Sequence, residues 1–397
     1  MNFVSLNEEI EKYLLDNGAL KVGFVTKEGM MGDPPSADIT YALPKAQSAV
    51  SFAVPLDKDK IRAFLRKDLP NGRVEHEIDN IKAYLKAYKI SNEVARILKE
   101  KGHEALALFP NFKYREDVPF SGVRSFPPVS LRYLAVRSGA GIYGWSGNVG
   151  LKGYGATIIL GGLVTSAKLE PTDPIPQSET FCNECKLCEK VCTLRMFGGE
   201  NESVSIGGHE FSFTKRRHLM RCFAGCGGYA GLDKEGKWST WSPGRYPYPE
   251  TNDDVVRLLA QSFRLKRKWY IKGEKKGYEI SNLKKDGGVT DEEYEALLAQ
   301  NKKALKDLKN VTLTCGNCQL ICWGDPKETA ENYKILTNSG CAVQKKNDEL
   351  VILPPEEARD LFYELGNKNR KSLGNKIVSW IAYKYLKRAN KYFQRDG

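Results

Sequence analysis

The feature that most constrains this chain is the segment "FCNECKLCEKVC", which places four cysteines within residues 181–192. Their spacing is C-x2-C-x2-C-x3-C. In this pattern a short loop wraps three thiolates around one [4Fe–4S] cluster, while the fourth cysteine reaches a second cluster. Structural zinc sites usually draw on separated C-x2-C pairs instead. The spacing therefore favours iron–sulfur clusters over zinc.

Two [4Fe–4S] clusters need eight thiolates, and the rest of the chain can supply them. "TCGNCQLICWG" at residues 314–324 adds three cysteines, and either Cys222 or Cys226 can complete the count. In the crossed arrangement, the first three cysteines of the 181–192 segment share a cluster with Cys322, and the fourth joins the remaining ligands. The predicted ligands are Cys182, Cys185, Cys188, Cys192, Cys222, Cys315, Cys318 and Cys322.

Charge, cysteine usage and the first residues bear on where the protein works. The opening segment lacks the features of a signal peptide, and predicts a helix with a capping box of Ser5 and Glu8. Nine of the ten cysteines lie between Cys182 and Cys322, and in a reducing compartment such a group serves metal or redox chemistry. We therefore expect a cytoplasmic protein. The net charge of +12 fits a solvated basic surface, a nucleic acid, an acidic protein or an anionic membrane.

The first part of the chain alternates helix and strand patterns. "EEIEKYLLDNG" and "IDNIKAYLKAYKISNEVARILKEKG" have helical periodicity, whereas "LKVGFVT", "AVSFAVPL" and "HEALALFP" are short apolar runs that predict strands. This alternation predicts an α/β layer structure. Residues 139–165 then carry nine glycines, which allow either close approach to a large flat ligand or tight turns. Taken alone, the composition leaves both interpretations open.

These patterns predict four regions. We expect an α/β core over residues 1–175 and a two-cluster module over 176–226 and 311–330, interrupted by an inserted subdomain over 227–310. Residues 331–397 are expected to form a helical segment. Its last helix has an apolar side and several lysines and arginines, which predicts docking on the body; peripheral contact with a membrane surface is the alternative.

The cysteine segments, together with "LAVRSGAGIYG" and "GYGATIILGGLVTSAKLEPTDPI", resemble the cobalamin-dependent reductive dehalogenases and epoxyqueuosine reductases. The resemblance runs over residues 76–192 and resumes at 215–226 and 313–330. It implies an α/β (α+β) fold, with a nitroreductase-like core that binds a corrinoid (cobalamin) and a ferredoxin-like module with two [4Fe–4S] clusters. The glycine-rich stretch would then line the corrinoid, through Gly139, Gly141, Tyr143, Gly144, Tyr154, Gly155, Gly161 and Gly162.

The resemblance also implies where the substrate lies. The tyrosine that donates a proton in the dehalogenases corresponds to Tyr84, with Tyr88 one turn further on. Ser125 stands where the epoxyqueuosine reductases have an aspartate, and Ile159 stands at the position of the dehalogenase arginine. We therefore expect the catalytic site near Tyr84, Arg124 and Ser125.

A reductase of a small-molecule substrate is the function that these features favour. The clusters would take electrons from a low-potential ferredoxin or flavodoxin and pass them to the corrinoid. One alternative is an electron-transfer or corrinoid-reducing protein that serves a partner enzyme. Another is a tRNA-modifying reductase, in which the basic segment "RLKRKWYIKGEKK" at 264–276 contacts phosphates and stacks on bases.

Overall fold

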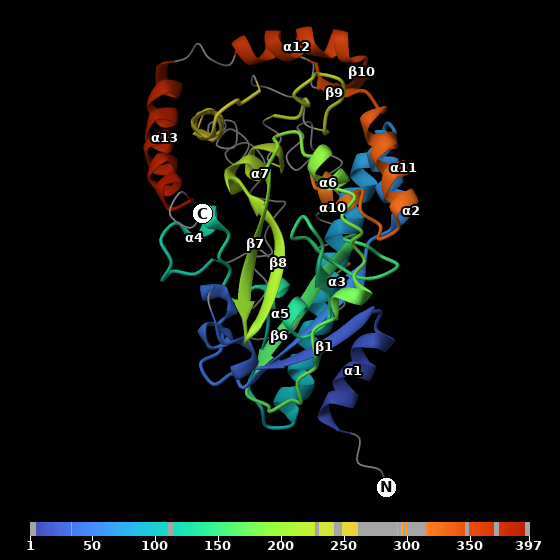
Figure 1. Ribbon diagram of the computed structural model, residues 1–397, viewed down its shortest axis with the longest axis vertical. Helices are drawn as coiled ribbons and strands as arrows, with labels where there is room; N and C mark the ends of the chain where they lie inside the picture. The colour runs from blue at the N-terminus through green and yellow to red at the C-terminus, as the bar shows by residue number, and fades with distance from the viewer. Residues whose placement is uncertain are drawn as a thin grey trace.

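The structure is a computed structural model of the chain (Figure 1). Most of the predicted insertion, including the basic segment at 264–276, lies outside the described residues, so the predicted tRNA contacts there stay a prediction. The described residues are 5–32, 34–109, 114–226, 230–241, 248–260, 315–345, 349–368 and 373–393, with isolated positions between 292 and 299.

An antiparallel sheet of four strands organises the first half of the chain. Its strands are β1 (Lys21–Thr26), β2 (Ser48–Pro55), β6 (Ile158–Thr165) and β3 (Ala105–Ala107), in the order β1-β2-β6-β3. The central strands β2 and β6 are buried along almost their whole length. Continuous apolar runs are what strands covered on both faces require.

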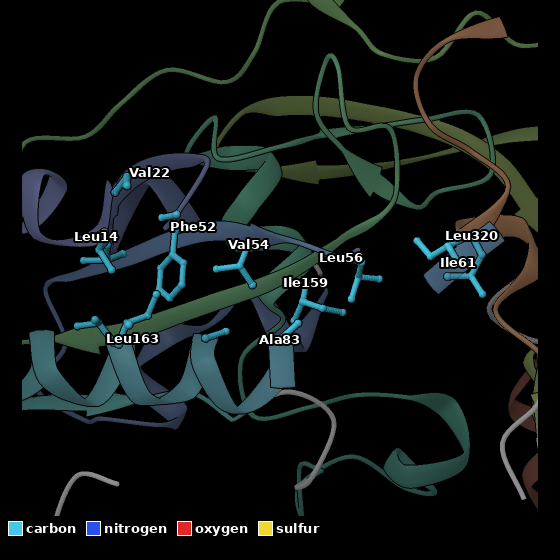
Figure 2. Close-up of a cluster of buried hydrophobic side chains, with 14 of the residues drawn as sticks. Leu14, Val22, Phe52, Val54, Leu56, Ile61, Ala83, Ile159, Leu163 and Leu320 are labelled. Atoms are coloured by element: carbon cyan, nitrogen blue, oxygen red, sulfur yellow. The ribbon is translucent and has the colours of Figure 1, made fainter. Parts of the chain in front are cut away.

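Helices cover both faces of this sheet. α1 (Leu6–Asp16), α2 (Lys58–Arg66) and α3 (Gly72–Glu100) pack on one face, and α5 (Leu131–Arg137) packs on the other. The α/β architecture predicted from the sequence is therefore confirmed. Figure 2 shows the core on the α3 side, formed by Leu14, Phe52, Val54, Ala83, Ile159 and Leu163 among others.

The predicted capping box of α1 is present. The Ser5 hydroxyl accepts a hydrogen bond from the Glu8 backbone N–H at 3.2 Å, and the Glu8 carboxylate accepts one from the Ser5 N–H at 2.7 Å. Two N–H groups that the first helical turn leaves unpaired are thereby satisfied. The helix ends as expected before Gly18, which has a φ of +88°.

A long hairpin that we did not predict lies against the glycine-rich stretch. β7 (Phe197–Ile206) and β8 (His209–Arg216) pair antiparallel around Gly207 and Gly208, which both have positive φ. A Gly-Gly pair between two segments of alternating polar and apolar residues is a hairpin signal. Figure 1 shows the hairpin running from the core sheet towards α7 (Leu219–Cys226).

The C-terminal region is less helical than predicted. α11 (Pro326–Thr337) precedes an antiparallel pair of strands, β9 (Cys341–Gln344) and β10 (Leu350–Leu353), and α12 (Pro355–Lys368) and α13 (Leu373–Phe393) follow. The remaining elements are β4 (Ile142–Tyr143), β5 (Val149–Gly150), α4 (Ser121–Arg124), α6 (Leu187–Lys190), α10 (Asn317–Leu320) and the 3-10 turns Glu28–Met30, Pro35–Ala37, Ile39–Tyr41 and Gln177–Glu179.

Helix α13 docks on the body, as its apolar side predicts. Leu386 and Ala389 are buried in a cluster with Val255 and Leu259. Trp380 on its outer side remains 60% exposed. Within the described residues, no helix combines the length and the apolar character needed to cross a bilayer.

A buried histidine on α3 should make the protein sensitive to acid. Burial lowers the pKa of His76, which packs against the Phe64 ring, to about 4 from 6.5. As the pH falls, His76 becomes protonated in the unfolded chain before it does so in the folded protein. Its contribution to the free energy of unfolding is therefore fully present above pH 6.5 and is lost as the pH falls towards 4. At pH 5 the loss should be about 2 kcal/mol. Urea unfolding at pH 7 and pH 5 checks this, and His76→Phe should remove that part of the difference; an unchanged difference would contradict it.

Candidate iron–sulfur centre

Three short helices and their loops carry the cysteines. α6, α7 and α10 present them, and the intervening loops depend on left-handed backbone at Glu184, Lys186 and Gly316, with φ of 55°, 56° and 102°. A left-handed conformation at a residue other than glycine costs about 1 kcal/mol or more. The tight turns of a ligand loop are a place where such a cost is accepted.

The first sulfur group joins Cys182, Cys185 and Cys188 to Cys322. All four line one cavity. Burial raises the pKa of Cys322 to about 11; the neighbouring Cys182 and Cys185 contribute to this rise, and the backbone N–H groups of Gly324 and Ala156 oppose it. Burial likewise raises the pKa of Cys188, where Cys318 and Cys322 add to the effect. Mutual repulsion of this kind requires a cationic centre before all four thiols can ionise.

The second sulfur group joins Cys192 and Cys222 to Cys315 and Cys318. Burial raises the pKa of Cys318 to about 12, followed by the charges of Cys315 and Cys222. The pKa of Cys192 is raised by burial and then by Cys315, Cys318 and Cys222. The structure thus brings the cysteines together in the crossed arrangement that their spacing predicts. That they bind iron stays a prediction.

The structure also distinguishes Cys222 from Cys226. Their Sγ atoms lie 3.7 Å apart on successive turns of α7. The charge of Cys222 raises the pKa of both Cys192 and Cys318. The cysteines that affect the pKa of Cys226 are Cys222 and Cys315. Cys222 therefore stands within the second group and Cys226 beside it. This placement supports Cys222 as the eighth ligand.

Hydrogen bonds from the loop after β4 reach both groups. The Trp145 N–H donates to Cys182 Sγ at 3.3 Å, and Asn148 Nδ2 donates to Cys318 Sγ at 3.5 Å. The Met196 N–H donates to Cys192 Sγ at 3.3 Å. Such N–H···S bonds favour the thiolate and tune a bound cluster. Neither Trp145 nor Asn148 was among the residues predicted from the sequence.

The spacing of the cysteines is what favours clusters over a single metal ion. In the part of the chain that the structure describes, no three Cys, His, Asp or Glu side chains are placed to hold one metal ion. Zinc would need ligands about 2.3 Å from one centre. The thiolates of a cubane bind different iron atoms and therefore stand further apart. Two groups of four sulfurs suit two [4Fe–4S] clusters.

The glycines predicted to line a corrinoid are packed against protein atoms instead. A Cβ on Gly155 would lie 2.2 Å from the Cys322 carbonyl oxygen, and one on Gly161 would lie 2.3 Å from the Phe52 ring. Gly141 is blocked by Val149 at 2.4 Å. These glycines permit close packing of the chain, which is the structural alternative left open above. The same close packing holds for Gly139, Gly144 and Gly162.

The two tyrosines of the predicted lining do not form a cradle either. Tyr143 is buried, and its ring centre lies 5.0 Å from that of Phe213 in the hairpin. Tyr154 is 37% exposed. That these residues line a corrinoid stays a prediction, and we derive no step through this group.

The predicted catalytic residues come from α3 and from the end of α4, which contacts α7. Tyr84 is partly buried on α3, where burial, followed by the charge of Cys226, raises its pKa. Arg124 stacks on the Phe126 ring at 4.8 Å, and Ser125 is exposed with a φ of 60°. That these three residues form one catalytic site stays a prediction.

Comparison with known sequences finds one family of relatives. No family model matches the chain. It is 24% identical over 180 residues to an epoxyqueuosine reductase of Atelocyanobacterium thalassa (isolate ALOHA), a match that covers 45% of this chain. The chain thus spans about half, 52%, of the length of that relative. The resemblance to the epoxyqueuosine reductases, which the motifs predict, is confirmed.

Solved structures give weaker similarities. The reductive dehalogenase NpRdhA in complex with 3-bromo-4-hydroxybenzoic acid has a TM-score of 0.38 and 16% identity, over 52% of this chain and 27% of its own. An epoxyqueuosine reductase from Bacillus subtilis has a TM-score of 0.39 and 15% identity, over 96% of this chain and 98% of its own. TM-scores below 0.5 do not establish a shared overall fold.

Proposed function

We propose that the chain is an oxidoreductase whose two [4Fe–4S] clusters pass electrons to an acceptor beside the second cluster. The observation that carries this proposal is the crossing of the chain, which places Cys322 in the first sulfur group and Cys192 in the second. Each cluster passes one electron at a time, so two neighbouring clusters form a relay. The match to a protein named epoxyqueuosine reductase supports a reductive reaction.

Exposure of the sulfur groups suggests the direction of electron flow. Cys185 and Lys186 are exposed at the first group, whereas the four cysteines of the second group are all partly buried. A low-potential donor such as a ferredoxin or flavodoxin can approach the exposed group. The enclosed group then delivers electrons to the acceptor, on the side of α3 and Cys226.

A corrinoid is the acceptor that the relatives imply, and it would supply low-valent cobalt chemistry when bound. No residue of this chain is assigned to it. Anaerobic reconstitution with cobalamin, followed by desalting and cobalt analysis, tests whether the protein retains it. Retention of about one cobalt per chain supports the corrinoid enzyme, whereas none contradicts it and favours electron transfer to a partner.

Tyr84 is the proton donor in this proposal. Its hydroxyl is protonated at neutral pH, but burial, followed by the charge of Cys226, raises its pKa, so it donates this proton only to a strongly basic, reduced acceptor. Tyr84→Phe should therefore slow turnover by about 10²- to 10⁴-fold with the cluster spectra unchanged. Tyr88→Phe is the matched control, because Tyr88 lies one turn away against Phe109.

Turnover is measured with a reduced viologen as donor, and with epoxyqueuosine or 3-bromo-4-hydroxybenzoate as acceptor. Equal loss of activity in the Tyr84 and Tyr88 variants would contradict the role of Tyr84. If the wild-type clusters are reduced but neither acceptor reacts, the assignment to these two reactions is wrong. Under that outcome, the electron-transfer alternative predicts activation of a partner enzyme.

A further inference from the structure

The β7–β8 hairpin brings a partly buried arginine to the second sulfur group. Arg216 is the last residue of β8 and lies six positions before Cys222. The hairpin is fixed to the loop after β4 by a hydrogen bond from the Thr214 N–H to the Trp145 carbonyl at 2.7 Å. It is also fixed by packing of Phe213 on Tyr143. The position of Arg216 is therefore set by the hairpin as a whole.

Three consecutive loop residues hold Arg216, a second arginine and a cluster ligand. Arg216 Nη2 donates to the Ser146 carbonyl at 3.1 Å, and Arg132 Nη1, from α5, donates to the Gly147 carbonyl at 3.2 Å. The next residue, Asn148, donates to Cys318 Sγ at 3.5 Å. The loop thus ties both guanidinium groups to the second sulfur group.

Neither arginine forms a close ion pair with a carboxylate of the described residues. Among the described residues, no ion pair within 4.0 Å involves Arg132 or Arg216, and Arg216 Nε is buried without a hydrogen-bond partner. Burial raises the pKa of the Glu202 carboxylate in β7, whereas the charges of Arg216 and Arg132 lower it. Two partly buried cations without an ion pair are costly unless a further negative charge compensates them.

The thiolates of the second group are that negative charge. Burial and then Arg132 lower the pKa of Arg216, while Cys222 and Cys318 raise it. A cluster with four thiolates is itself anionic, and it gains a further negative charge when it is reduced. Cations held close to it in a low-dielectric interior favour the reduced state. The first group has the exposed Lys186 nearby, whose field water and salt screen.

We propose, on the basis of the two-cluster relay, that Arg132 and Arg216 are positioning residues that raise the reduction potential of the second cluster above that of the first. Electrons that enter at the exposed first cluster then collect at the enclosed second cluster, next to the acceptor. The hairpin is the part of the chain that builds this bias. This role needs neither a corrinoid nor a particular substrate.

Redox titration of the reconstituted protein, monitored by EPR, tests the proposal. In Arg216→Gln and in Arg132→Gln, the electron-transfer equilibrium between the clusters should shift at least tenfold towards the first cluster, which corresponds to about 59 mV for a one-electron couple. Arg216→Lys keeps the charge and should retain most of the wild-type potential. Lys215→Gln is the matched control, because Lys215 precedes Arg216 in β8 but its side chain is 36% exposed.

The outcomes separate this inference from the proposed function. If both clusters assemble in the arginine variants and both potentials stay at their wild-type values, the inference is wrong and the relay stands. If the wild-type protein assembles fewer than two clusters, the relay itself is wrong. If Arg216→Gln alone fails to assemble the second cluster, Arg132→Gln decides the question, since its side chain comes from a separate helix.

Discussion

Replacement of Cys222 by alanine should halve the iron content of the reconstituted protein, from about eight to about four atoms per chain. Cys222 stands within the second sulfur group, next to Cys192, Cys315 and Cys318. Without its thiolate, one iron of the cubane lacks its protein ligand and the cluster is lost. Iron and sulfide analysis after anaerobic reconstitution measures this directly.

Cys226→Ala is the matched control for that experiment. Cys226 lies on the same helix, one turn away, with its Sγ 3.7 Å from that of Cys222. The structure places it beside the group, so iron content should stay at about eight atoms per chain. The reverse result, with iron lost in Cys226→Ala and retained in Cys222→Ala, would show that the assignment of the eighth ligand is wrong.

The second large effect is expected at Gly155, where the glycine-rich stretch meets the first sulfur group. An alanine Cβ there would lie 2.2 Å from the Cys322 carbonyl oxygen and 2.4 Å from the Gly324 N, and the residue has a φ of +61°. These are backbone atoms that cannot rotate away. Gly155→Ala should therefore lower the free energy of unfolding by about 3 kcal/mol or more and displace Cys322 from the first cluster.

Gly153→Ala separates the clash from the backbone strain. Gly153 has a φ of +83°, but nothing lies within 4 Å of the added Cβ. Its cost should be about 1 kcal/mol, with both clusters intact. Urea unfolding and iron analysis of the two variants give the comparison. Equal losses in both would mean that the contact between Gly155 and the Cys322 loop does not hold the first group.

Local patterns were sufficient to predict the core of the fold. The runs that became β1, β2 and β3 were recognised because they are apolar and bounded by turn residues, and the Ser5 and Glu8 capping box fixed the start of α1. The crossed grouping of the cysteines was also predictable. It depends on a short-range spacing that only a few ligand geometries satisfy.

The glycine-rich stretch shows where such patterns stop being informative. A glycine lets the backbone come close to a ligand, and it equally lets the backbone come close to another part of the chain. The atoms that fill the space beside Gly155 and Gly161 belong to Cys322 and Phe52, more than a hundred residues away in sequence. The resemblance to corrinoid enzymes predicts a ligand beside this stretch, and the packing of these glycines on other parts of the chain does not test that prediction.

Two parts of the site depended on tertiary structure. The β7–β8 hairpin has a turn signal at Gly207 and Gly208, yet its docking against Tyr143 and its delivery of Arg216 could not be read from residues 197–216 alone. The predicted trio of Tyr84, Arg124 and Ser125 was based on positional correspondence to relatives. The structure places Tyr84 near Cys226 and leaves Ser125 exposed.

The most direct test of the two-cluster relay is the EPR spectrum of the anaerobically reconstituted, fully reduced protein, together with its metal content. Two neighbouring [4Fe–4S] clusters should give about eight iron atoms and about two unpaired spins per chain, with signals broadened by their interaction. Tightly bound zinc with no paramagnetic signal, or a spectrum that integrates to a single cluster, would contradict the account.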